Sequence, residues 1–508
     1  MDTERASWRQ WAGLGVLALP TVLLGLDVTA LYLVVPSLAE DLNPTAAQTL
    51  WIMDVYGFLI AGFLITMGTL GDRIGRRRLL MIGMTAFGAA SALAAFAPSA
   101  LWLIIARALL GVAGATLMPS TLSLIGNMFT DARRRALAIG VWATMFALGM
   151  ALGPVVGGVL TASFWWGAVF LIAVPATLVV LVAAPVLLPE FRTGAGRLDL
   201  VSVGLSLAAL LPLIYAIKHV AAHGLDAQGP IAVLAGAVSA VAFVRRQLRL
   251  PEPLLDMTLF GNRAFSAALA VLLVGLIGFG GVMYLVTQYL QFVTGLSPTS
   301  AGLWMGPPAL AMLVGAIGAP LVAARVSPGV LMAATLVLSV LGYALLVGAG
   351  TEAKWSVVAG FALVYLGLGV IAALGTDIVV GAAPPARSGS AAALSETVQE
   401  LGIAAGVALL GSLTTVIYRA VVEVPAGAGE SYREGIASAA GAAQHLPGTA
   451  LDNARSAFTA GVNLVAGVSG LAIAVAALVC FATLRHLRPL GEHGRQEEPV
   501  TSSGGEGG

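Results

Sequence analysis

Long apolar segments separated by short polar ones make up most of this chain. A helix that crosses a bilayer needs about 20 apolar residues. Runs of this length predict an all-α integral membrane protein with 14 transmembrane helices, although Pro212 and the sequence GPP at 306–308 interrupt two of them. The expected spans are residues 13–38, 49–70, 78–97, 101–126, 136–160, 166–188, 199–219, 229–247, 263–290, 299–323, 328–349, 355–382, 391–418 and 458–486.

Arginine and lysine are distributed unevenly among the loops that join these segments. If the N-terminus lies inside and successive loops alternate, 20 of the 26 basic residues fall on the inner side and five on the outer side. Cytoplasmic loops carry the excess of basic residues in membrane proteins. We therefore expect a multi-pass protein of the cell (plasma) membrane with both termini cytoplasmic. The five outer residues are Lys218, Lys354, Arg419, Arg433 and Arg455.

The composition also indicates a membrane protein. Charged residues make up 10% of the chain, against about 25% in soluble domains. The single Cys480 excludes an internal disulfide, and its apolar surroundings predict a packing role. The long outer loop contains ESYREGIASAAGAA, which is compatible with a short surface helix, and the polar residues 488–508 predict a disordered cytoplasmic tail.

A few ionisable residues fall inside the predicted spans, where a carboxylate is unfavourable by about 2.5–3.5 kcal/mol on insertion scales. Such groups usually face a water-filled cavity or the bundle interior, and they mark substrate or proton paths. For Asp54 and Asp377 a position in the headgroup region is an open alternative. The set is Asp27, Asp54, Arg107, Asp377, Glu396 and Glu400.

Glu396 and Glu400 are four residues apart and therefore share one face of their helix. Burial and a neighbouring carboxylate both favour the protonated form of an acid, so either glutamate is a candidate proton carrier. Both are also candidates to bind a cationic substrate. Because the proton must leave before the cation binds, this competition is a physical basis for antiport.

Arg107 needs a partner in a low-dielectric core, and we expect Asp27 to supply it. Two alternatives stay open, in which Arg107 bonds only to backbone carbonyls or extends its charge to the membrane surface.

Two glycine patterns predict structural roles. Gly149, Gly153 and Gly157 lie on one helix face, where small residues let a second helix approach closely, and Pro154 allows a bend. In GDRIGRRRLL, glycines allow a tight turn and the acid can cap a helix or pair with an arginine.

Aromatic and amide side chains within the spans suit a lipophilic cation, which aromatic faces attract. Packing against neighbours or lipid is an equal alternative for each of them. The candidates for a substrate cavity are Trp51, Trp142, Phe146, Tyr284 and Gln288.

An enzyme is not expected. The five histidines lie at span edges or outside the spans, and no metal-ligand cluster, nucleophile–base pair or phosphate-binding G-x-x-x-x-G-K-[ST] loop is visible. We expect no metal and no cofactor.

Several motifs together resemble the major facilitator superfamily, and within it the drug:proton antiporters with 14 helices. GTLGDRIGRRRLL resembles the loop between the second and third helices of that superfamily. LGLDVTALYLVVPSL, LIIARALLGVAGA, LGMALGPVVGG and APPARSGSAAALSETVQELGIAAGVALLGSL resemble, in the expected order, motifs of the first, fourth, fifth and thirteenth helices.

The resemblance implies two six-helix bundles, at residues 1–190 and 251–487, with two inserted helices at 191–250 between them. It implies alternating access and proton antiport, with Asp27, Asp54, Asp377, Glu396, Glu400 and Arg107 in proton coupling or cation binding. It assigns a conformational latch to Gly71, Asp72, Arg73, Gly75, Arg76 and Arg77, and a hinge to Gly149, Gly153, Pro154 and Gly157.

The expected function is therefore export of lipophilic, often cationic drugs such as dyes, quaternary ammonium compounds or fluoroquinolones. The proton gradient drives it, through a monomer in the lipid bilayer and without a nucleic-acid partner. The alternative is a dedicated exporter of one self-made antibiotic, metabolite or lipid-like molecule.

Overall fold

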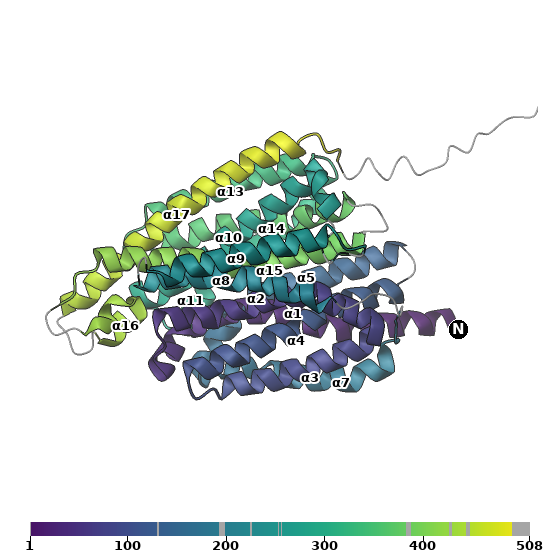
Figure 1. Cartoon of the computed structure of the whole chain (residues 1–508), viewed down its shortest axis with the longest axis horizontal. Coiled ribbons are helices and arrows are strands. Elements are labelled where there is room, and N and C mark those ends of the chain that lie inside the picture. Colours follow the sequence, from purple (N-terminus) through teal and green to yellow (C-terminus); the bar gives the residue numbers. More distant parts are fainter. Residues whose placement is uncertain are drawn as a thin grey trace, which may run out of the picture.

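Helices account for most of the chain that the computed structural model describes, and they run side by side along one direction (Figure 1). The described residues are 2–129, 132–192, 199–223, 226–251, 253, 255, 257–382, 388–425, 429–442 and 448–489. Within them, 14 helical spans have the length and apolar composition needed to cross a membrane. This agrees with the number predicted from sequence.

The first six spans come from seven helices, because α6 and α7 form one span. These helices are α1 (Asp2–Leu42), α2 (Ala46–Ile74), α3 (Arg76–Ala95), α4 (Ala100–Met128), α5 (Ala132–Ser163), α6 (Ala168–Leu171) and α7 (Ala173–Leu187). The next two spans are α8 (Leu200–His223) and α9 (Gln228–Gln247).

The last six spans include one that is divided and one that is extended. α11 (Pro298–Trp304) and α12 (Gly306–Ala323) share a span, and a π-helical turn at Tyr289–Val293 extends α10 (Arg263–Gln288). The others are α13 (Pro328–Val347), α14 (Lys354–Gly381), α15 (Ser388–Val421) and α17 (Gly448–Leu484). A 3-10 turn at Met257–Gly261 precedes α10, and Glu430–Arg433 forms another before α16 (Ile436–Ala442).

The helix breakers act differently at the two interrupted spans. Pro212 lies inside α8 and does not end it, whereas the GPP sequence starts α12 and so divides its span in two. The structure also contains the expected short helix of the long loop, as α16, at the end of the bundle opposite the N-terminus (Figure 1). Most of the predicted tail, from residue 490 on, lies outside the described residues.

Small residues bring α1 and α5 into close contact. A side chain at Gly149 would collide with the carbonyl oxygen of Val22, and one at Gly25 with the backbone of Phe146. Thr29 Oγ1 donates a hydrogen bond across this contact to the carbonyl of Met150, at 2.9 Å. The glycine face predicted on the fifth span therefore packs on the first.

The same arrangement recurs between α10 and α15, where the sequence analysis did not identify it. A side chain at Gly280 would collide with the backbone of Ile403, and one at Gly406 with the backbone of Ile277. A first span and a fifth span are thus joined by small residues in each half of the chain.

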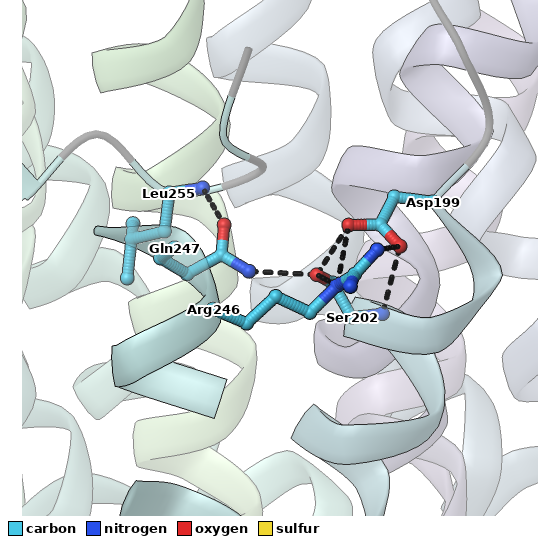
Figure 2. A network of polar contacts seen from close by, with 5 residues as sticks. All are labelled: Asp199, Ser202, Arg246, Gln247 and Leu255. Carbon is cyan, nitrogen blue, oxygen red and sulfur yellow. Dashed lines mark hydrogen bonds and ion pairs between the residues drawn. The ribbon is translucent and has the colours of Figure 1, made fainter. Parts of the chain in front are cut away.

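A network of hydrogen bonds joins the start of α8 to the end of α9 (Figure 2). Arg246 donates to Asp199 at 2.8 Å, and this hydrogen bond lowers the pKa of Asp199 to about 2. Ser202 also bonds to Asp199, and Gln247 donates to Ser202 at 2.7 Å while accepting from the backbone N–H of Leu255. The two inserted helices are therefore one hairpin.

Gly149→Leu should destabilise the protein, because the added side chain has no space between α5 and α1. Overpacking of a tight contact typically costs about 1–3 kcal/mol, so we expect the apparent melting temperature in detergent to fall by several degrees. Gly140→Leu on the same helix is the matched control, since a side chain there meets open space. Equal melting temperatures for the two variants would contradict the packing described here.

Candidate functional site

Charged side chains from five helices meet inside the bundle. They are Asp27 on α1, Asp54 on α2, Arg107 on α4, Lys218 on α8 and Glu400 on α15. Of these, only Asp27 keeps appreciable exposure, at 13% of its side chain. Because a buried charge is unfavourable unless it is paired, the partners of each group define what the site can do.

Asp27 and Arg107 form the predicted ion pair. Arg107 Nη1 lies 2.5 Å from Asp27 Oδ2, and its Nε donates to the carbonyl of Ile52 at 3.1 Å. The guanidinium also lies over the ring of Tyr56, 4.3 Å from its centre. Arg107 thus joins α4 to α1 and α2, and its charge is compensated within the bundle.

Asp54 is paired with Lys218, which the sequence analysis assigned to an outer loop. That assignment is wrong: Lys218 Nζ lies 2.6 Å from Asp54 Oδ2, and both side chains are buried. Asp54 itself lies within the span Ala47–Leu64 and is fully buried in the protein. Lys218 falls at the end of the predicted span 199–219 and was counted with the loop that follows it, whereas α8 continues to His223 and Lys218 is a buried helical residue.

The ammonium of Lys218 also lies over Trp51, 4.2 Å from the ring centre. Trp51 and Asp54 are three residues apart on α2 and therefore present their side chains to the same neighbour. Together they surround the ammonium with a carboxylate and an aromatic face.

Glu396 and Glu400 on α15 differ from the two aspartates. They lie close enough to each other for their negative charges to repel, and the charge of Asp27 also repels that of Glu400. Within the described part of the chain, no ion pair joins either glutamate to a basic side chain. Glu400 is buried and Glu396 is partly exposed. These two acids therefore lack the compensation that the aspartates have.

Asp377 differs from these acids because it lies at the protein surface. It lies four residues before the end of α14 and is exposed. The alternative of a position near a membrane surface stays a prediction for this residue.

A cavity of about 1070 Å³ opens at the end of the bundle that carries α16. Tyr284 and Gln288 line it, as does Leu50 of α2. The Oε1 atoms of Gln288 and Gln291 are buried in its wall without a hydrogen-bond partner among the described residues. Unsatisfied polar atoms of this kind are available to a bound molecule.

The other predicted cavity residues have different surroundings. Trp51 holds Lys218, and Trp142 donates from Nε1 to Thr121 Oγ1 at 3.0 Å. Phe146 belongs to the packed contact between α5 and α1. None of the three lines the cavity described above.

The predicted latch forms a charge network at the turn between α2 and α3. Arg76 pairs with Asp72 at 2.7 Å and donates to the carbonyl of Pro119 on α4 at 3.2 Å. Gly75 occupies a left-handed conformation, with φ of 109°, that other residues rarely adopt. Gly71 packs against the side chain of Arg76, while Arg73 is exposed.

Glu190 completes this network and was not identified from sequence. Its carboxylate accepts from the backbone N–H of Arg77 at 3.1 Å, and the guanidinium of Arg77 donates to the carbonyls of Pro185 and Leu188. A lone acid just after a predicted span carries no periodic pattern, so only the fold brings it to the turn.

Comparison with known proteins agrees with this architecture. The Major Facilitator Superfamily profile matches residues 17–407. The chain is 44% identical to the multidrug efflux pump LfrA of Mycolicibacterium smegmatis, over 95% of this chain and 98% of that protein. It is 36% identical to the methyl viologen resistance protein SmvA of Salmonella typhimurium, over 83% and 86%.

A third relative is the tetracenomycin C resistance and export protein of Streptomyces glaucescens, at 31% identity over 97% of this chain and 95% of that protein. Among solved structures, a bacterial homologue of the human lysosomal transporter Spinster superposes with a TM-score of 0.64 and 17% identity. The alignment covers 94% of this chain and 97% of that one, which shows a shared fold. The chain belongs to the major facilitator superfamily.

Proposed function

We propose that this protein is a proton-coupled antiporter that exports lipophilic, often cationic drugs by alternating access. The observation that carries the proposal is the contrast among the four acids inside the bundle. Asp27 and Asp54 are paired with Arg107 and Lys218, whereas Glu396 and Glu400 have no basic partner in the described structure.

Carboxylates that lie inside a bundle without a basic partner favour binding either a proton or a cation. When both glutamates are protonated, the site is neutral and has little attraction for a cationic drug. When a proton leaves, the negative charge attracts the drug cation. Proton and drug therefore exclude each other, which is the condition for exchange.

The names of the relatives support the drug substrates, since two of them are called a multidrug efflux pump and a methyl viologen resistance protein. A second candidate, dedicated export of one antibiotic or related metabolite, is supported by the tetracenomycin C exporter and by a probable actinorhodin transporter of Streptomyces coelicolor, 34% identical.

The remaining parts fit an alternating-access cycle. We assign the halves to residues 1–190 and 251–487, with the α8–α9 hairpin between them, in a monomer whose termini are cytoplasmic. The α1–α5 contact at Gly149, Gly153 and Gly157 acts as the hinge, and the turn with Asp72 and Arg76 acts as the latch.

Neutral variants of the two glutamates test this proposal. In proteoliposomes with an acidic lumen, adding ethidium should release luminal protons through the native protein. Glu396→Gln and Glu400→Gln should each reduce that flux, and the double variant should abolish it, because the other two acids of the site, Asp27 and Asp54, are held in ion pairs. Luminal pH is followed with an entrapped fluorescent indicator.

Glu352→Gln is the matched control, since Glu352 is exposed and lies outside the spans. It should transport like the native protein. Unchanged proton flux in the double glutamine variant would contradict the proposal, and the absence of flux with every compound in a cationic panel would favour the dedicated exporter.

The ion pair between Asp27 and Arg107 gives a separate prediction. Removing one partner of a buried pair is destabilising by about 3–5 kcal/mol, while replacing both can be nearly neutral. Arg107→Met should therefore lower the melting temperature, and the double variant Asp27→Asn with Arg107→Met should recover most of the loss. A double variant as unstable as Arg107→Met alone would show that the two charges do not compensate each other.

A further inference from the structure

Lys218 occupies surroundings that would suit a drug cation. A carboxylate supplies charge and an aromatic face supplies cation–π attraction, which together are the groups expected to bind a lipophilic cation. In this protein Asp54 and Trp51 provide both, and Lys218 is between them at 2.6 Å and 4.2 Å. The protein thus places its own ammonium where a substrate ammonium would bind.

The ion pair between Asp54 and Lys218 has fewer supporting hydrogen bonds than a purely structural ion pair needs. An ammonium has three N–H donors, yet among the described residues Asp54 is its only polar partner, and neither Asp54 oxygen has another hydrogen bond. The pair between Asp27 and Arg107, by contrast, is reinforced by the carbonyl of Ile52. Because a buried ion pair is favourable only when further hydrogen bonds satisfy its remaining donors, the Asp54–Lys218 pair is less well stabilised than the Asp27–Arg107 pair.

The position of α8 allows such a replacement. Phe58 of α2, Ile214 of α8 and Ala404 of α15 form one apolar cluster, so α8 contacts both halves of the chain at once. The side chains that α2, α8 and α15 contribute to this cluster are all apolar, and the ion pair between Asp54 and Lys218 joins α2 to α8. The network of Figure 2 holds α8 to α9 instead.

The ammonium of Lys218, once displaced, can move toward the end of α8. Lys218 is five residues before His223, where α8 ends, which is about 7–8 Å along the axis at 1.5 Å per residue. The flexible stem of a lysine can move its ammonium part of this distance toward the end of the helix. The substrate cation then takes the place of the ammonium beside Asp54 and Trp51.

We propose that Lys218 is a tethered competitor of the transported cation: it occupies the site formed by Asp54 and Trp51 when no substrate is bound, and the cationic group of the substrate displaces it. This inference rests on the proposed function, because it requires a cationic substrate. It gives the inserted hairpin a direct part in substrate binding.

The lysine content of the chain makes a direct test possible. Lys218 and Lys354 are the only two lysines, so the Lys354→Arg variant has Lys218 as its single lysine. The purified variant in detergent is treated with an amine-reactive ester, and modification of Lys218 is measured by mass spectrometry. The probes are tetraphenylphosphonium and the neutral triphenylphosphine oxide.

Saturating tetraphenylphosphonium should increase the rate of modification at Lys218 by on the order of tenfold, and triphenylphosphine oxide should leave it unchanged. Half of the increase should occur at the dissociation constant measured by calorimetry. If the cation binds and the modification rate stays the same, Lys218 is not displaced and the inference is overturned.

Binding to variants provides a second test. Lys218→Met should bind tetraphenylphosphonium on the order of tenfold more tightly than the native protein, and adding Asp54→Asn should remove that gain. Lys354→Met is the matched control: its ammonium also lies over a tryptophan, Trp304 at 4.5 Å, but no carboxylate is paired with it in the described structure. It should bind like the native protein.

The inference would be overturned if the native protein and Lys218→Met bound tetraphenylphosphonium with equal affinity. It would also be overturned if neither protein bound this cation. The ethidium-driven proton flux described above separates the two ideas. If flux persists while Lys218 is not displaced, only the competitor role fails. If flux is also absent for every cation, the cationic substrate class fails with it.

Discussion

The low dielectric of a membrane-spanning bundle governs this structure, because a charge buried there needs a partner. Each of the three buried basic side chains in the described structure is paired with an acid: Arg76 with Asp72, Arg107 with Asp27 and Lys218 with Asp54. The last two pairs lie in the candidate site. These two pairs join helices that are far apart in sequence, so they contribute to the arrangement of α1, α2, α4 and α8. Against this background the two glutamates of α15 differ, because neither is paired with a basic side chain in the described structure, and the proposed exchange of proton and cation is assigned to them.

Much of the architecture was predictable from the chain alone. Apolar run length identified the 14 spans, and the spacing of Gly149, Gly153 and Gly157 identified the face of α5 that packs on α1. The pairing of Arg107 with Asp27 followed from the need of a buried guanidinium for an acid. In each case a local pattern or a strong energetic requirement was sufficient.

Other features depend on contacts that no local pattern encodes. Lys218 lies near the end of its helix, where a lysine normally reaches the membrane surface, and only the packing of α8 on α2 turns it toward Asp54. Glu190 meets the turn at Gly75 because α7 ends beside α3. The α10–α15 contact could not be predicted from sequence, because the two glycines that allow it, Gly280 and Gly406, lie on different helices.

The central claim is that binding of a cation and loss of a proton are the same event at Glu396 and Glu400. It is tested most directly by adding tetraphenylphosphonium to the purified protein in weakly buffered detergent solution and recording the pH. The account predicts that saturating cation releases protons from the native protein and none from the double variant Glu396→Gln with Glu400→Gln. Saturable binding to the native protein without any proton release would contradict it.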